Sequence, residues 1–139
     1  MTKLAAALTL MFFSLAPAMP ARAADAPPEA RALIERQLDA FANGDANAAY
    51  AIAAPGIQKM FRDAEFFMAM VKTQYAPVYR HRSVEFGPSA LIDDAVEQSV
   101  TLVDPDNVVW KALYHLSRQG DGSWRIEGCV LARSDDASL

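Results

Sequence analysis

Apolar residues in the first half of the chain recur at the spacing of an amphipathic helix. The first such stripe consists of Ala30, Leu33, Ile34, Leu38 and Phe41. Pro28 precedes it, and proline suits the first helical turn because its missing N–H costs nothing there. Gly44 suits the residue just past a helix end, so the first helix is predicted to run from Pro28 to about residue 42.

Further helices are predicted downstream, each with a recognisable start. Asp45 and Asp63 are typical N-cap residues, because a carboxylate accepts hydrogen bonds from free backbone N–H groups. Pro55 and Gly56 interrupt the pattern, and Pro77 ends the helical region. The predicted segments are a short helix at 46–54, one turn at 57–61 and a helix at 64–75. We expect the last to be largely buried, since Phe66, Phe67, Met70, Val71 and Tyr75 cover much of its circumference.

After Pro77 the pattern changes from helical spacing to alternation of apolar and polar residues, which is typical of strands. The predicted strands are 79–86, about 95–103, 108–118 and 123–133. The loops between them are 87–94, 104–107 and 119–123, and the last two carry the Asp, Asn and Gly residues of tight turns. Helices followed by consecutive strands indicate an α+β fold, with the helices packed on a curved antiparallel four-stranded sheet.

Alternation also predicts which face of the sheet meets the helices. The inner face is predicted to carry Arg80, Arg82, Val84 and Phe86; Val96, Gln98, Val100 and Leu102; Trp110, Ala112, Tyr114 and Leu116; and Trp124, Ile126, Gly128, Val130 and Ala132. The outer face is predicted to carry Lys111, Leu113, His115, Arg125, Glu127, Cys129 and Leu131. The outer set is apolar enough to serve as a homodimer surface.

The first 23 residues have the layout of a secretory signal peptide. Lys3 precedes an uncharged apolar core at 4–16, and small residues stand at the cleavage positions. We expect cleavage after Ala23, with Ala26 as the alternative, and export to the periplasm. An uncleaved membrane anchor is the other interpretation, but the apolar run is shorter than the roughly 20 residues of a span.

Residues 24–139 are then predicted to form a single domain. They carry 11 basic and 17 acidic residues, a formal charge of −6. This balance makes nucleic acid and anionic membranes unlikely partners, since both bind basic footprints. Cys129 is the single cysteine, so no internal disulfide can form. We interpret it as a structural thiol, with a reactive thiol or an intermolecular disulfide as the alternative.

Two sequence stretches resemble a known family. PVYRHRSVEF (77–86) and DGSWRIEGC (121–129) are similar to the bacterial domain of unknown function 4864 family, within the nuclear-transport-factor-2-like (cystatin-like) superfamily. The resemblance covers roughly residues 29–132. It implies a cone of helices and curved sheet around a pocket. Superfamily members include isomerases, dehydratases, hydrolases and small-molecule binders, and many dimerise, so the resemblance does not select an activity.

Arg80 and Arg82 are the first candidate site residues. On one strand face, two guanidinium groups two residues apart lie within about 7 Å of each other. Such a pair suits a carboxylate or phosphate ligand held through paired hydrogen bonds. The structural alternative is pairing with helix carboxylates, or stacking on Tyr79 or Trp124.

Gln98, Trp110, Tyr114 and Trp124 are the remaining pocket candidates. Aromatic side chains facing the helices are either core residues or the walls of a ligand cavity. Gln98 and the Tyr114 hydroxyl would supply its polar groups, and each requires a hydrogen-bond partner if buried.

Other chemistry finds little support in the sequence. His81 and His115, the two histidines, lie on the outer face by alternation, so we expect neither a metal site nor a cofactor. No acidic residue falls midway along the predicted inner face, as an acid–base isomerase on this fold would require. The leading hypothesis is therefore an exported binding or interaction domain with a pocket for a small anionic molecule. The alternatives are a small isomerase, dehydratase or hydrolase, and an envelope assembly factor.

Overall fold

A computed structural model describes residues 25–135. The predicted signal peptide, and the cleavage position after Ala23, lie outside this range. Five helices come first: α1 (Pro28–Ala42), α2 (Ala46–Ala51), α3 (Pro55–Met60), α4 (Ala64–Gln74) and α5 (Ala76–Tyr79). Four strands follow: β1 (Ser83–Ile92), β2 (Ala95–Val103), β3 (Val109–Arg118) and β4 (Trp124–Arg133). The predicted order of elements is confirmed.

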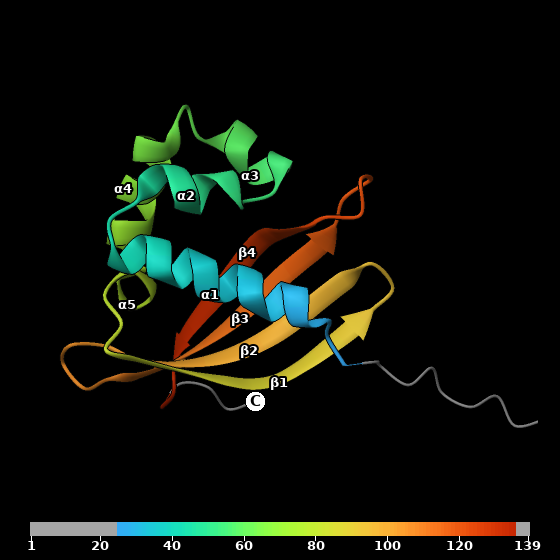
Figure 1. The fold of residues 1–139 in the computed structure, drawn as a ribbon. Helices are drawn as coiled ribbons and strands as arrows, with labels where there is room; N and C mark the ends of the chain where they lie inside the picture. The colour runs from blue at the N-terminus through green and yellow to red at the C-terminus, as the bar shows by residue number, and fades with distance from the viewer. Residues whose placement is uncertain (1–24, 136–139) are drawn as a thin grey trace, which may run out of the picture.

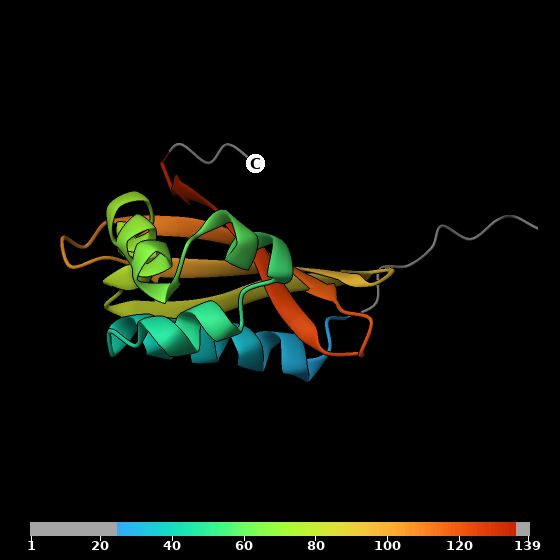
Figure 2. The same ribbon diagram turned by 90° about the horizontal axis from the view of Figure 1, so that it is seen from above.

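The strands form one antiparallel sheet in the order β1-β2-β3-β4. Figure 1 shows the helices stacked on one face of this curved sheet, and Figure 2 shows the same layers from above. The α+β fold class is therefore confirmed. None of the helices between residues 25 and 135 is long and apolar enough to cross a lipid bilayer.

The helix starts follow the predicted caps. The Asp45 carboxylate accepts a hydrogen bond from Ala48 N, and Asp63 does the same for Phe66 N, each at 3.0 Å. Pro55 begins α3 rather than ending α2, because proline is tolerated in the first helical turn. The expectation of a largely buried 64–75 helix is wrong at Phe66, which is 49% exposed and packs under the Arg62 guanidinium.

The predicted strand 79–86 is the main error in the element boundaries. Residues 76–79 form α5, with Pro77 in its first turn, and β1 begins only at Ser83. Arg80 and Arg82 therefore lie in the turn between α5 and β1 and do not share a strand face. The alternation at 79–86 is misleading because a single helical turn is too short to display its own period.

The first strand also extends further than predicted. Residues 87–92, predicted as loop, belong to β1, and only Asp93 and Asp94 turn the chain into β2. A bulge between Phe86 and Ser89 admits Gly87 and Pro88 into the strand. Bulges are where such residues occur in strands, because they leave the hydrogen-bond ladder locally unpaired.

A second bulge lies in β4 and changes which side chains face the helices. Leu116 pairs with Ile126, but His115, which precedes Leu116 in β3, pairs with Gly128. Glu127 is thus one extra residue, and one extra residue reverses the alternation of all that follow. Cys129 and Leu131 come to lie beside Tyr114 and Ala112 on the inner face.

The predicted facing of this half of β4 is therefore wrong. Val130, expected inside, is 60% exposed. Gly128 and Ala132 likewise fall on the outer side, opposite His115 and Lys111. The remaining strands keep the predicted phase: Val96, Gln98, Val100, Leu102, Ala112, Tyr114 and Leu116 are all buried.

The core lies between α1, α2 and α4 on one side and β2 and β3 on the other. Its largest fully buried side chains are Tyr114, Ile34, Leu102, Leu116, Val96 and Val100. The segment after α2 also touches the sheet directly: Ala54 N donates to Ile126 O at 2.8 Å, and Ile126 N donates to Ile52 O at 3.1 Å. These bonds cover the edge of β4 before its bulge and leave the edge beyond it uncovered by this segment.

Candidate functional site

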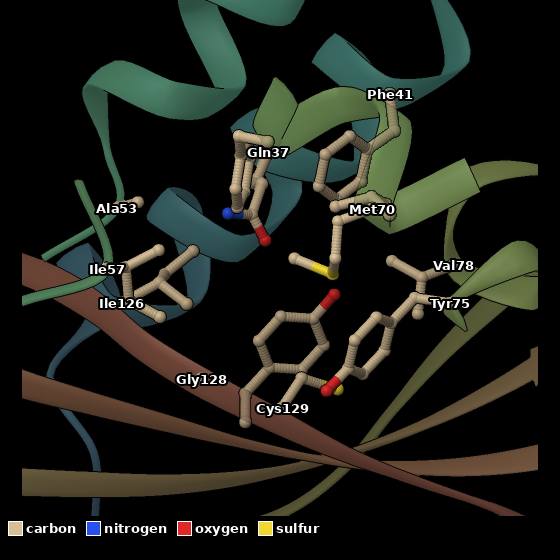
Figure 3. Close-up of a pocket in the computed structure, with 13 residues that line it drawn as sticks. Gln37, Phe41, Ala53, Ile57, Met70, Tyr75, Val78, Ile126, Gly128 and Cys129 are labelled. Atoms are coloured by element: carbon tan, nitrogen blue, oxygen red, sulfur yellow. The ribbon is translucent and has the colours of Figure 1, made fainter. Parts of the chain in front are cut away.

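A cavity of about 80 Å³ lies between the helices and the sheet. We call it the inner cavity. Side chains of α1, α3 and α4 form its helical walls, and β3 and β4 form the wall on the sheet side. Figure 3 shows Gln37 and Met70 reaching into this space from the helices, with Cys129 on the sheet side. Most of its lining is apolar, including Phe41, Ala53, Ile57, Phe67, Met70 and Ile126.

Two buried polar side chains face this apolar space. Tyr114 is 1% exposed, and its hydroxyl has no hydrogen-bond partner within residues 25–135. Gln37 is 4% exposed, and its side-chain amide forms no hydrogen bond to another described residue. Buried polar groups in native proteins are normally hydrogen-bonded, so the Tyr114 hydroxyl at this cavity is unusual.

Burial keeps two ionisable groups of the cavity lining, Tyr114 and Cys129, in their neutral forms. Burial raises the pKa of the Tyr114 hydroxyl well above its ordinary value of 10.0, and the neighbouring Cys129 raises this pKa further. Burial also raises the pKa of the Cys129 thiol from 9.0 to about 12. At neutral pH the cavity therefore offers a phenol and a thiol but no thiolate. This favours the structural interpretation of Cys129, because the thiolate is the nucleophile.

A larger and more polar hollow adjoins the inner cavity. This outer hollow has a volume of about 850 Å³ and lies between the α4–α5 junction, the β2–β3 loop and the second half of β4. Its charged residues are Arg80, Asp104 and Asp106. Tyr75 and Cys129 line both spaces.

Asp104 organises one side of the outer hollow. One carboxylate oxygen accepts hydrogen bonds from the backbone N–H groups of Asp106 and Val108, and the other accepts one from the Trp110 indole, each at 2.9 Å. The indole hydrogen bond, followed by those from the backbone, lowers the pKa of the Asp104 carboxyl below its ordinary value of 3.8. Trp110 and the β2–β3 loop are therefore held in one arrangement.

The structure separates the six predicted pocket residues into different places. Tyr114 lines the inner cavity, whereas Arg80 and Trp110 line the outer hollow. Arg82, Gln98 and Trp124 line neither of the two spaces. Arg80 and Arg82 are both exposed, so neither guanidinium reaches the interior between helices and sheet.

Three candidates have structural partners. The Gln98 amide, 4% exposed, donates to the carbonyls of Gly87 and Ser99 at 2.9 and 2.8 Å, and so satisfies the carbonyl that the β1 bulge releases. The Arg82 guanidinium donates to the side chain of Asn107. Trp124 packs under the Arg118 guanidinium at 5.0 Å. The hydrogen-bond partner that the sequence demanded for Gln98 is therefore present.

The inner cavity is also lined by Gln37, Tyr75 and Cys129, which the sequence pattern did not predict as site residues. Gln37 had a detectable signal, since it stands three residues after Ile34 and four before Phe41, within the apolar stripe of α1. Cys129 had none, because only the β4 bulge turns it inward. Gln37, a polar residue in the apolar stripe of α1, could therefore have been found from the sequence. The change of register in β4 that brings Cys129 to the site could not.

The histidines lie away from both spaces. His115 is on the outer face, 3.6 Å from Glu97, and the His81 ring contacts Val78 O at 2.9 Å. No acidic or histidine side chain lines the inner cavity. Within residues 25–135, no group of three or more His, Cys, Asp or Glu side chains is placed to hold a metal ion.

The raised pKa of Cys129 predicts a change of stability with pH. Below pH 9.0 the thiol is neutral in both the folded and unfolded states. Between pH 9.0 and about 12 the unfolded thiol ionises while the folded one does not, so stability falls as pH rises. Urea unfolding of wild type and Cys129→Ala should show a steeper loss in wild type between pH 8 and pH 10, by about 1 kcal/mol. Equal slopes would contradict burial of the thiol.

Comparison with known proteins supports the fold and the resemblance. No curated protein matches the chain. A solved structure from Silicibacter pomeroyi DSS-3, described as an NTF-2 like protein of unknown function, superposes with a TM-score of 0.50 at 16% sequence identity. The match covers 76% of this chain and 93% of that one. At this identity the likeness concerns the fold alone.

The sequence itself matches a family over all the residues that the structure describes. The match extends over residues 23–139, and so contains every helix and strand as well as both spaces described above. The resemblance inferred from the stretches at 77–86 and 121–129 is confirmed, and this chain belongs to the family described as Domain of unknown function (DUF4864).

Proposed function

We propose that this protein is an exported, non-catalytic domain that binds a small molecule in the inner cavity. The observation that carries the proposal is the Tyr114 hydroxyl, which is buried beside an apolar cavity without a partner in residues 25–135. Small-molecule sites are mostly apolar with a few polar groups that orient the ligand, and the inner cavity has this composition. The signal-peptide layout of the first 23 residues supports export to the periplasm.

The energetic cost of Tyr114 supports a functional role. A buried hydroxyl without a partner costs about 1–3 kcal/mol, whereas phenylalanine would fill the same space without that cost. A ligand that accepts a hydrogen bond from Tyr114 would recover this energy on binding. Gln37 adds an amide that both donates and accepts, so it tolerates several ligand polarities.

The lining favours an uncharged ligand in the inner cavity. None of its lining residues is Arg, Lys or His, so a bound anion would lack a counter-charge there. A neutral carbonyl, ether or hydroxyl oxygen matches the Tyr114 donor. The anionic ligand expected from Arg80 and Arg82 is therefore not proposed for the inner cavity, because both side chains are exposed outside this space.

Two features support binding over catalysis. General acid–base catalysis requires a group that exchanges a proton near the working pH. The raised pKa values of Tyr114 and Cys129 keep both groups protonated, and no carboxylate lines the inner cavity. The alternative of a small isomerase, dehydratase or hydrolase would require the substrate to react in the outer hollow, where Asp106 lies.

A small anion remains the second candidate ligand, at the outer hollow. Arg80 lines this space and forms no side-chain hydrogen bond or ion pair with another described residue. Arg82 is held by Asn107 and lies outside the hollow. The two arginines are thus no longer equivalent, and Arg80 is the one placed to contact a carboxylate or phosphate.

The outer face of the sheet is the surface that we propose for a homodimer or for an envelope assembly partner. It exposes Val130, Ile92 and Val109 by 60%, 54% and 39%. The same face also carries Glu97 and His115, which lie 3.6 Å apart across β2 and β3. Val130 pairs with the half-buried Leu113 near the middle of β3 and β4, whereas Ile92 and Val109 lie at opposite ends of the sheet. An apolar centre with polar surroundings is the usual composition of such an interface.

Removal of the Tyr114 hydroxyl tests the proposed cavity ligand. Tyr114→Phe should raise the stability of the unliganded protein by about 1 kcal/mol, because it removes a buried polar group that lacks a partner. The same variant should lose the thermal shift caused by neutral carbonyl compounds in wild type. The measurements are urea unfolding and a thermal-shift screen of the purified protein.

Tyr50→Phe is the matched control. The Tyr50 hydroxyl donates to Gln58 O at 2.7 Å, so its removal should destabilise the protein by about 1 kcal/mol. It should leave the ligand shifts intact, because Tyr50 lines neither space. Ligand shifts that survive in Tyr114→Phe would remove the basis of the proposal.

The anion site is tested separately with Arg80→Ala and Arg82→Ala. In a thermal-shift screen against small carboxylates and phosphates, Arg80→Ala should lose any stabilisation that wild type shows. Arg82→Ala should retain it, because its guanidinium is bonded to Asn107 away from the hollow. Identical anion shifts in wild type and Arg80→Ala would rule out the anion site.

The dimer is tested by a charge on the outer face. Val130→Glu should convert a sedimenting dimer into a monomer, since an unpaired carboxylate in an apolar interface is costly. Met60→Glu is the control, because Met60 is 76% exposed on α3 and lies on the helical side. Sedimentation of wild type as a monomer at all accessible concentrations would contradict the homodimer and leave assembly with another protein as the use of this face.

A further inference from the structure

The inner cavity and the outer hollow are neighbours that share two lining residues. Tyr75 and Cys129 belong to both, and Figure 3 shows both side chains at the sheet side of the inner cavity. Tyr75 comes from the junction of α4 and α5, and Cys129 comes from β4 just beyond its bulge. The wall between the two spaces is thus made of one phenol ring and one thiol.

This wall consists of side chains with few restraints. The Tyr75 side chain forms no hydrogen bond to another described residue, and Tyr75 itself is non-helical, with φ −127° and ψ 41°, between the end of α4 and the start of α5. The Cys129 thiol has only a long contact of 3.8 Å to Val130 O. Rotation of the Tyr75 ring would break no hydrogen bond among the described residues, so only the packing of this half-buried ring opposes its movement.

The inner cavity is too small to bind a ligand tightly by itself. A cavity of roughly 150 Å³ accepts benzene, so about 80 Å³ accommodates about three or four non-hydrogen atoms. Even at the upper limit of affinity per atom, so small a ligand binds no tighter than a Kd on the order of tens of micromolar. A ligand of higher affinity has to extend beyond this space.

We propose that the two spaces are the two ends of one binding site for an elongated neutral molecule, whose carbonyl end accepts a hydrogen bond from Tyr114 and whose apolar chain passes between Tyr75 and Cys129 into the outer hollow. This inference rests on the proposed binding function and names the class of ligand. Tyr75 is then the residue that determines which chains pass.

The outer hollow suits the chain end of such a molecule. Pro77, Trp110 and Leu131 give it an apolar part, and Trp110 is fixed by its hydrogen bond to Asp104. The charged residues Arg80 and Asp106 also line it. An uncharged chain therefore finds an apolar surface bordered by charges of both signs, and it needs no counter-charge of its own.

The experiment uses nuclear magnetic resonance of the wild-type protein with a series of unbranched methyl ketones. The Met70 methyl group reports on the inner cavity, and the Trp110 indole N–H reports on the outer hollow. Met60, which is 76% exposed, and Trp124, which lines neither space, are internal controls. Dimethyl ketone should shift the Met70 signal alone, whereas methyl hexyl ketone should shift both Met70 and Trp110.

Affinity along the series provides a second measurement. Each methylene buried beyond the inner cavity should lower the Kd by about two- to fourfold. Methyl ketones that shift neither reporter would overturn both the binding function and this inference. Short ketones that bind at Met70, with no response of Trp110 to longer ones and no gain in affinity with length, would overturn this inference alone.

A substitution at the wall tests the role of Tyr75. Methyl pentyl ketone and methyl neopentyl ketone are isomers with the same number of carbons, and the neopentyl chain is shorter and wider. In Tyr75→Ala the ratio of their Kd values should shift by about tenfold in favour of the wide neopentyl isomer, because the passage is wider. Tyr79→Ala, which removes a half-buried ring of α5 that lines neither space, should leave the ratio unchanged. An unchanged ratio in Tyr75→Ala would refute the passage.

Discussion

The extra residue Glu127 in β4 is the constraint on which the proposed site depends. A strand alternates its side chains with a strict period of two, so a single inserted residue reverses every position that follows. Beyond this bulge, Cys129 and Leu131 face the helices beside Tyr114 and Ala112, and Val130 faces outward. With regular pairing, Gly128 would lie opposite Tyr114 in place of Cys129, and Val130 would face inward opposite Ala112, so the outer sheet face would lose its most exposed apolar residue. One local irregularity therefore decides both the inside and the outside of this sheet edge.

The site also shows how stability and ligand binding oppose each other in a small domain. A domain of this size is marginally stable, and a buried hydroxyl without a partner uses a considerable part of that margin. Two further polar residues of the interior, Gln98 and Tyr50, have their hydrogen bonds satisfied by backbone carbonyls. The Tyr114 hydroxyl is different, because it has no partner among residues 25–135, and Tyr114 and Gln37 border the same cavity. The coincidence of position is the reason to assign them to a ligand rather than to imperfect packing.

The arginines illustrate how a correct residue choice can rest on a wrong geometry. Arg80 and Arg82 attracted attention as a pair on one strand face, but the single turn α5 places them in a connecting segment. There they have different environments, since Arg82 is bonded to Asn107 and Arg80 borders the outer hollow. Their significance is therefore to be judged one at a time. The proposed binding site therefore has an apolar inner cavity and an outer hollow bordered by charged residues. The two arginines do not form a charged entrance to the inner cavity.

The amino-acid sequence by itself determined the order of elements, the fold class, the family and most of the core. Helix caps, turn residues and the two periods of alternation are local features, and local features are sufficient for those assignments. The facing of β2 and β3 was predictable for the same reason, because these strands carry no bulge relative to each other. The tertiary structure alone decided the inward turn of Cys129, the helical turn at residues 76–79 and the meeting of Tyr75 with β4. A bulge is a property of the pairing between two strands, and a cavity is a property of the packing between two layers, so neither is encoded in the pattern of any single segment.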